Sequence, residues 1–177
     1  MQKSNVSVLD LMCKDKYAEA NNHKRARDEL TNESKMWIIR RNDYNERAKR
    51  SSEEANALRK ERDTFNAKVK DLKEKRNACQ AKAAELKDIK GPEYDRLREE
   101  ANSYHNEMVE CHEKGQQIHE RMSKLFDDAD GSRKAANAAH NRSIECRKKA
   151  DEEHKLYVAA LESVKNLKDD IPDFDLE

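Results

Sequence analysis

Apolar positions in the first half of the chain recur in alternating steps of four and three residues, from Leu30 to Leu86. One of the two alternating series is mostly large and apolar and includes Leu58 and Leu72, whereas the other alternates alanine or valine with arginine. A seven-residue repeat keeps one face of a helix turned toward a partner helix. The pattern therefore predicts a long helix with a narrow, partly polar seam.

Three similar fragments follow the same repeat. They are RRNDYNERAK from Arg40, ERDTFNAKVK from Glu61 and KRNACQAKAA from Lys75. Their shared motif, Arg-(Asn/Asp)-x-(apolar)-(Asn/Gln), recurs after 21 and then 14 residues, and both intervals are multiples of seven. The fragments are therefore expected along one coiled-coil helix and not in separate binding loops.

The second half keeps one heptad phase from residue 97 to residue 171, past Gly115 and Gly131. Between the halves lies Gly91-Pro92, where the glycine suits the end of one helix and the proline suits the first position of the next. The sequence thus predicts an all-α fold, a long antiparallel coiled-coil helical hairpin that turns at Gly91-Pro92. A kink or break near Gly131 is the alternative kept open, because glycine weakens a helix by about 1 kcal/mol.

This interpretation gives three parts. Residues 1–21 form an N-terminal segment, expected as a short helix that packs against the base of the hairpin or against another subunit. Residues 22–171 form the hairpin, with 22–90 as its first arm and 92–171 as its second. Residues 172–177 form an acidic tail, which either frays or serves as a docking peptide.

An antiparallel hairpin folded at Gly91 pairs residues whose numbers add up to about 182. Large side chains then meet small ones, which favours close packing. Trp37 should face the region around Cys146, and Phe65 should approach Gly115 and Ile118.

The histidines provide a second check on this register. Five of the six share one heptad position beside the seam: His105, His112, His119, His140 and His154. The same sum pairs three of them with polar residues of the repeated fragments: His105 with Asn77, His119 with Asp63, and His140 with Asn42. Imidazole groups facing amides or a carboxylate are a plausible device for fixing which part of one helix lies beside which part of the other.

Composition supports long helices. The 177 residues are 42% charged and 5% aromatic, with three glycines and two prolines, so there are too few large apolar residues for a deep globular core. No stretch approaches the roughly 20 apolar residues of a membrane span, and the N-terminus has no signal-peptide pattern. The four cysteines form no CxxC pair, as is typical of small buried residues in a reducing compartment. We expect a cytoplasmic protein without a membrane segment.

Charge is distributed unevenly, although the net charge is zero. Residues 22–90 hold 20 Lys/Arg and 13 Asp/Glu, whereas residues 92–177 hold 14 and 21. One interpretation is that two oppositely charged helices neutralise each other, and the other is that the basic half also presents a surface to phosphate groups. Both can hold together.

Basic residues gather toward the turn. Residues 59–90 hold 11 Lys/Arg and six Asp/Glu, which describes either an ordinary solvated helix face or an RNA-binding tip. The candidate nucleic-acid-binding residues are Lys68, Lys70, Lys73, Lys75, Arg76, Lys82, Lys87 and Lys90. Stacking aromatics are scarce there, so any RNA contact should be made to the phosphate backbone and should depend little on base sequence.

No motif indicates catalysis, a cofactor, a small-molecule substrate or a metal. Histidines seven residues apart on one helix are about 10 Å apart, too far to share an ion. The segment DDADGS from Asp127 fails as a calcium loop, because aligning Gly131 with the loop glycine puts Phe126 at the first ligand position and Asn137 at the twelfth. We expect a protein that is not an enzyme.

The three repeated fragments, preceded by the single tryptophan in MWIIRRND, resemble an archaeal coiled-coil family rich in KRDELNAKVKEL-type repeats. That family is distantly similar to the eukaryotic nuclear segregation, or brefeldin-resistance, coiled-coil proteins associated with polysomes and messenger ribonucleoprotein. The resemblance, strongest from Trp37 to Leu86, implies an adaptor associated with RNA or the ribosome. The alternative is a structural coiled coil that engages only proteins through its helical faces, as a homodimer for example, using the segment from Val6 to Met12 and the tail.

Overall fold

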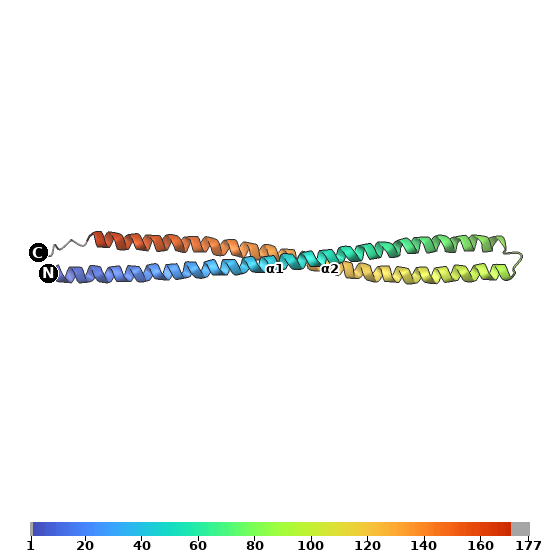
Figure 1. The fold of residues 1–177 in the computed structure, drawn as a ribbon, viewed down its shortest axis with the longest axis horizontal. Coiled ribbons are helices and arrows are strands. Elements are labelled where there is room, and N and C mark those ends of the chain that lie inside the picture. Colours follow the sequence, from blue (N-terminus) through green and yellow to red (C-terminus); the bar gives the residue numbers. More distant parts are fainter. Residues whose placement is uncertain (1, 171–177) are drawn as a thin grey trace. The chain divides into compact units, whose positions relative to one another are not determined.

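The chain forms two long helices joined by a short turn. In a computed structural model, which describes residues 2–170 and only the backbone of residues 2–7, α1 spans Gln2–Glu85 and α2 spans Pro92–Asp169. The two helices run antiparallel and side by side, and no strand occurs in the described residues (Figure 1). The predicted all-α helical hairpin is therefore confirmed.

The first arm begins earlier than the sequence predicted. Because α1 starts at Gln2, the N-terminal segment continues the first arm, and the expected separate short helix over residues 1–21 is wrong. Cys13 and Ala20 are buried at seam positions that precede the buried Ser34 by multiples of seven, so the heptad phase already extends upstream of residue 22. The predicted acidic tail lies outside the described residues.

The second arm is one helix. α2 passes through Gly131 without interruption, so the break considered there is absent. Ala129 and Ala136 are buried on either side of this glycine at successive seam positions. Packing of the alanines on both sides therefore outweighs the weak helix propensity of a single exposed glycine.

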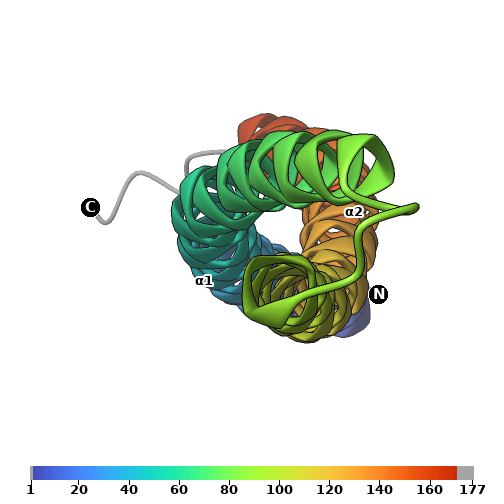
Figure 2. The ribbon, with the colours of Figure 1, turned by 90° about the vertical axis from the view of Figure 1, so that its right-hand side faces the viewer.

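The turn differs in one respect from the prediction. α1 ends at Glu85, and the peptide N–H groups of Ile89 and Lys90 both donate to the carbonyl of Leu86 at 3.1 Å. Lys90, not Gly91, adopts the left-handed conformation, with φ of 38°. Figure 2 looks onto this turn, which joins the end of α1 to the start of α2.

Pro92 begins α2, as predicted. The carbonyl of Gly91 accepts a hydrogen bond from the Asp95 peptide N–H at 3.2 Å, which places Gly91 just before the first helical residue. Proline fits this first position because it has no N–H group to satisfy. Gly91 therefore belongs to the start of the second helix and does not cap the first.

Contacts divide the chain into two compact units, each containing one stretch of each helix. Unit 1 comprises Met1–Tyr44 and Lys134–Glu177, and unit 2 comprises Asn45–Arg133. Most buried side chains in both units are small, which lets the helix backbones approach closely. The buried alanines at predicted seam positions are Ala48, Ala55, Ala83, Ala101, Ala129, Ala136, Ala139, Ala150 and Ala160.

Unit 2 contains the main cluster of larger apolar side chains. Leu58, Ile118 and Met122 are buried together, and Phe65 packs against them. The Cβ of Phe65 lies 3.8 Å from the position that a Cβ of Gly115 would take. The predicted approach of Phe65 to Gly115 and Ile118 is therefore confirmed.

In unit 1, the single tryptophan lies between two arginines. The guanidinium carbons of Arg40 and Arg142 lie 4.7 and 4.5 Å from the ring centroid of Trp37, a cation–π arrangement on an exposed seam edge. Trp37 and Cys146 line one shallow hollow, as the register predicted. Inside the seam, the hydroxyl of Ser34 donates to the carbonyl of Ser143 at 3.0 Å, so both buried hydroxyl-bearing positions are used in packing the two helices.

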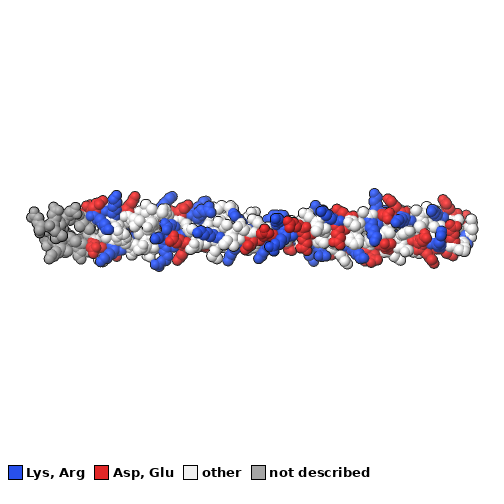
Figure 3. Space-filling model, viewed as in Figure 1, with Lys and Arg blue, Asp and Glu red and all other residues white. Residues whose placement is uncertain are grey.

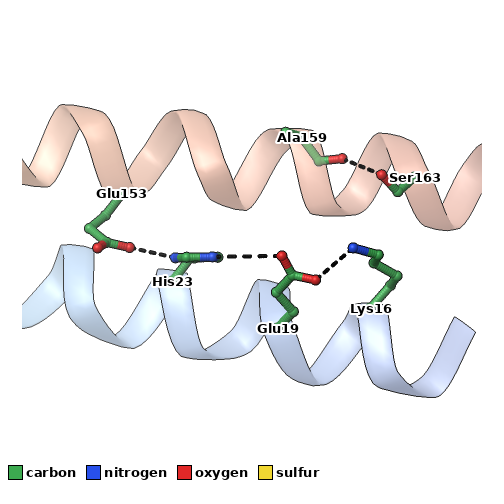
Figure 4. A network of polar contacts seen from close by, with 6 residues as sticks. All are labelled: Lys16, Glu19, His23, Glu153, Ala159 and Ser163. Carbon is green, nitrogen blue, oxygen red and sulfur yellow. Dashed lines mark hydrogen bonds and ion pairs between the residues drawn. The ribbon is translucent and has the colours of Figure 1, made fainter. Parts of the chain in front are cut away.

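A polar network ties the start of α1 to the end of α2 (Figure 4). The Nδ1 of His23 lies 2.6 Å from Oε2 of Glu153, and its Nε2 lies 4.0 Å from Oε1 of Glu19. Lys16 donates to the other oxygen of Glu19 at 2.8 Å, and this hydrogen bond is the main reason that the pKa of Glu19 lies below its usual value. The network therefore links the sixth histidine, which is not in the stripe of five, to both helices.

Candidate nucleic-acid interface

The predicted basic residues near the turn fall into two groups. Three of them have partners: Lys68 contacts Glu107 at 3.4 Å, Lys75 contacts Asp71 at 3.1 Å, and Arg76 bonds Asn77 and His105. The hydrogen bond that Lys75 donates to the Asp71 carboxylate raises the pKa of Lys75 above its ordinary value. The other five are exposed and make no ion pair within the part of the chain that the structure describes: Lys70, Lys73, Lys82, Lys87 and Lys90.

One flank of the hairpin near the turn places basic side chains of the first arm opposite acidic side chains of α2, and the ion pair of Lys68 with Glu107 lies there. The Lys68–Glu107 pair sets the register, and moving seven residues along each helix in opposite directions brings Lys75 opposite Glu100 and Lys82 opposite Glu93. Residues 68–90 carry eight basic and four acidic side chains, whereas residues 92–110 carry two and six. The end of the hairpin is therefore neutral as a whole, and basic and acidic side chains are interspersed over the face seen in Figure 3.

The other flank near the turn holds an open hollow of about 270 Å³. We call it the turn hollow. Its lining comes from both helices and from the turn between them: Gln80, Ala83, Ala84, Lys87, Tyr94, Arg98, Ala101 and Asn102. No carboxylate of a described residue lines it, and it presents two cations, two side-chain amides and one aromatic ring.

Arg98 is held in place within the turn hollow. Its Nη1 donates to the hydroxyl of Tyr94 at 3.2 Å, and its guanidinium carbon lies 5.8 Å from the Tyr94 ring centroid. Its remaining N–H groups make no hydrogen bond to a described residue. These N–H groups are fixed donors, and the ammonium group of Lys87 is a flexible one. Together they can bind an anion such as a phosphate group.

Four arginines form a ladder with four histidines of α2, which we call the Arg–His ladder. Its rungs are Arg27 with His154, Arg41 with His140, Arg62 with His119, and Arg76 with His105. The two residue numbers add up to 181 in each rung. In three rungs Nη1 of the arginine lies at hydrogen-bond distance from Nδ1 of the histidine: 3.0 Å for Arg27, 3.3 Å for Arg41 and 3.1 Å for Arg76.

The ladder corrects the predicted pairing of histidines with amides and carboxylates. The register was right, but in two of the three predicted pairs the arginine that precedes the Asn bonds both the Asn and the histidine. Arg41, for example, donates from Nε and Nη2 to Oδ1 of Asn42 and from Nη1 to His140. The long arginine stem leaves the seam and its flat guanidinium group reaches two acceptors at once, which the shorter Asn42 side chain cannot do.

Metal binding and membrane insertion find no support in the described residues. No three His, Cys, Asp or Glu side chains there lie close enough to hold an ion together. The DDADGS segment is helical and forms no loop. Neither α1 nor α2 contains an apolar stretch that would span a lipid bilayer, as far as the chain is described.

These features define the class of protein: a two-helix antiparallel coiled-coil hairpin with a polar hollow, free of carboxylates, beside its turn. Residues 90–175, slightly less than half of the chain, match the model of a family described as "Family of unknown function (DUF7121)". The matched segment includes all of α2 and all five histidines of the stripe. No curated protein and no solved structure matches the chain.

Proposed function

We propose that this protein is a non-enzymatic adaptor that binds RNA through the turn hollow and associates in this way with the translation machinery in the cytoplasm. The observation that carries the proposal is the lining of the hollow, where Lys87 and Arg98 stand together without a carboxylate. The resemblance of the repeated fragments to archaeal and polysome-associated coiled-coil proteins supplies the expected partner.

The chemistry of the turn hollow favours backbone recognition. Phosphate groups take hydrogen bonds from arginine and lysine, and these contacts fix the position of the strand without reading its sequence. The amides of Gln80 and Asn102 can bond a ribose hydroxyl or a base edge, and the ring of Tyr94 offers an apolar surface to a base. Because the end of the hairpin is neutral as a whole, affinity should come from these local contacts more than from long-range attraction.

Binding of a fluorescently labelled single-stranded RNA, followed by anisotropy at several salt concentrations, tests the proposal. The double variant Lys87→Gln, Arg98→Gln should bind at least tenfold more weakly, since each charged hydrogen bond is worth about 1.5 kcal/mol. The slope of log K against log salt should fall by about 1.4, the value for two phosphate contacts to a single strand.

The matched control is Arg121→Gln with Lys148→Gln, which removes the same charges from exposed positions elsewhere on α2. This control should bind RNA as the unchanged protein does. Equal affinities for the two double variants would show that the turn hollow is not the RNA site.

A second candidate function, self-association through a helical face, is favoured by one observation. Val8, Leu11 and Met12 are 55%, 59% and 46% exposed, and their spacing puts them on one face near the start of α1. The partner that we propose for this apolar face is a second copy of the chain. Light scattering should then give about twice the single-chain mass of 20.7 kDa, and Leu11→Gln with Met12→Gln should restore the single-chain value. A single-chain mass for the unchanged protein at all concentrations would remove this candidate.

A further inference from the structure

A second hollow without a carboxylate in its lining lies farther along unit 2, at the Arg62 rung of the ladder. We call it the Arg62 notch, and its volume is about 340 Å³. It is lined by Arg62, Asn66, His112, Gly115, Gln116 and His119. Its side chains are a guanidinium group, two imidazoles and two amides, a set rich in hydrogen-bond donors.

Arg62 differs from the other three arginines of the ladder. Its Nε and Nη2 donate to Oδ1 of Asp63 at 3.2 and 2.9 Å, as their counterparts do to the neighbouring Asn or Asp in the other rungs. Its Nη1, however, makes no hydrogen bond to a described residue, whereas Nη1 of Arg27, Arg41 and Arg76 bonds a histidine. The guanidinium group is therefore oriented by Asp63 and keeps one donor edge for another acceptor.

Gly115 leaves the notch open. A Cβ at this position would lie 3.6 Å from Oδ1 of Asn66 and 3.8 Å from Cβ of Phe65, which are ordinary contact distances. Close packing therefore does not require glycine here, although glycine weakens the helix relative to alanine. What glycine does provide is space next to Arg62, because any longer side chain would extend into the notch.

The notch and the turn hollow lie on the same flank of unit 2. Arg98, in the turn hollow, and His119, in the notch, are 21 residues apart on α2, and Gln80, in the turn hollow, and Asn66, in the notch, are 14 residues apart on α1. Whole heptads return each helix to the same side, about 32 Å farther along α2. The ion pair of Lys68 with Glu107 lies on the opposite flank, at the other edge of the seam.

We propose that the Arg62 notch binds a phosphate group, and that this phosphate belongs to the RNA strand that occupies the turn hollow. The source of the phosphate rests on the proposed function. The notch itself rests on the free edge of Arg62, the space at Gly115 and a lining that holds no carboxylate, since Asp63, which pairs with Arg62, lies outside the lining. Arg62 bonds the phosphate oxygens, and His112, His119 and the two amides surround them.

The first experiment is a titration of the full-length protein with inorganic phosphate, monitored by NMR. Peptide signals around Arg62 and Gly115 should shift in a saturable way, and signals around Arg41 and His140, a rung whose Nη1 is already bonded, should not. Gly115→Met should abolish the shifts by filling the notch, and Gly131→Met, a change at the exposed glycine of the same helix, should leave them unchanged. Equal shifts at both rungs, or persistence in Gly115→Met, would overturn the notch as a phosphate site.

RNA oligomers of two lengths, about 4 and about 16 nucleotides, then identify the source of the phosphate. The longer oligomer should lose at least fivefold in affinity on Gly115→Met, whereas the shorter one, held in the turn hollow alone, should lose none. If RNA binds and neither length responds to Gly115→Met, the strand does not reach the notch and that part of the proposal fails. If no RNA binds but the phosphate shifts remain, the proposed function fails and the notch stands as a site for free phosphate.

Discussion

The residues that most distinguish this hairpin are the seam arginines. Arg27, Arg41, Arg62 and Arg76 occupy positions where a coiled coil usually places apolar side chains, and each is only partly buried. Arginine has no acceptor, so the histidine nitrogen that faces it in three rungs must be the unprotonated one. The three bonded rungs therefore use Nδ1 of the histidine as the acceptor.

The first prediction concerns the coupling within a rung. Arg41→Ala, His140→Ala and the double variant should show a coupling free energy of about 1 kcal/mol, the usual net value of a hydrogen bond, in a double-mutant cycle measured by urea unfolding. His112→Ala serves as the control, because His112 is exposed and makes no hydrogen bond to a described residue. A coupling indistinguishable from zero would mean that the Arg41 rung adds nothing to stability.

The second prediction concerns a buried thiol. Burial raises the pKa of Cys146, and the charge of nearby Glu33 raises it further. Since only the thiolate reacts, alkylation by iodoacetamide should be slow at neutral pH and should accelerate only above the pH at which a free cysteine does so. A thiol pKa raised by folding stabilises the fold below the ordinary thiol pKa, and this contribution is lost as the pH rises through the raised value.

This measurement needs a variant in which Cys13, Cys79 and Cys111 are changed to alanine. In that background, Glu33→Gln should shift the pH profile of Cys146 alkylation toward lower pH, because it removes the neighbouring negative charge. A profile that matches free cysteine in both proteins would contradict the prediction.

At the scale of elements, the two ends of the turn are set by different residues. Lys90 takes the left-handed conformation that glycine usually supplies, while Gly91 has an ordinary φ and open space around it. A lysine in this conformation is strained by about 1 kcal/mol. The ammonium group of Lys90 is exposed at the end of the hairpin, next to the candidate interface.

The third prediction follows from this geometry. Lys90→Gly should raise the free energy of unfolding by up to about 1 kcal/mol, because it relieves the strained backbone. Gly91→Ala should change it by less than about 0.5 kcal/mol, the usual range for a surface change that meets no clash. Thermal unfolding followed by circular dichroism compares the two, and the reverse order would show that the left-handed residue is Gly91.

The fourth prediction concerns the second helix. Gly131 is exposed and helical, and a Cβ added to it would meet no atom within 4 Å. Gly131→Ala should therefore stabilise the protein by about 1 kcal/mol through helix propensity alone. The same melting experiment measures it. A loss of stability would indicate that the glycine serves a local conformation other than the regular helix.

The helices themselves could be predicted well from the sequence, because a seven-residue repeat needs only one chain to be recognised. The seam residues Ala55, Leu58 and Ile118 are buried where the pattern placed them. The helix ends could be predicted less well. Lys90 adopts the left-handed conformation in a turn closed by hydrogen bonds to the Leu86 carbonyl. The sequence around Lys90 carries no signal for this conformation that is as strong as the glycine-proline pair that follows it.

The candidate site could be predicted only in part. Lys87 was identified from the basic composition of the first arm, but Gln80, Arg98 and Asn102 were missed. Arg98 lies in the acidic arm, where a count of charges hides it. The register that pairs the arms also brings Arg98 beside Lys87. Arg98 shares the heptad position of the five histidines, so a search for basic residues at that position in the second arm would have found Arg98.

For the whole molecule, the antiparallel register is the property on which the other conclusions depend. The fifth prediction tests it directly: in a background without other cysteines, Asn42→Cys with His140→Cys should crosslink within one chain through a short bismaleimide. Electrophoresis should show a crosslinked product at the mass of one chain. Asn42→Cys with Lys124→Cys is the control and should remain uncrosslinked, because it departs from the register by 16 residues. Crosslinking only between chains would mean that the arms exchange partners.

The constant sum of the rungs has a consequence for how this protein can change in length over evolution. An insertion or deletion in one arm would shift every rung beyond it against its counterpart, even if it spans a whole heptad. Only a matching event of equal size at the mirror position of the other arm restores the pairing. Homologous chains of different length should therefore have gained or lost residues in pairs placed symmetrically about the turn, so that the two halves of the gene change size together.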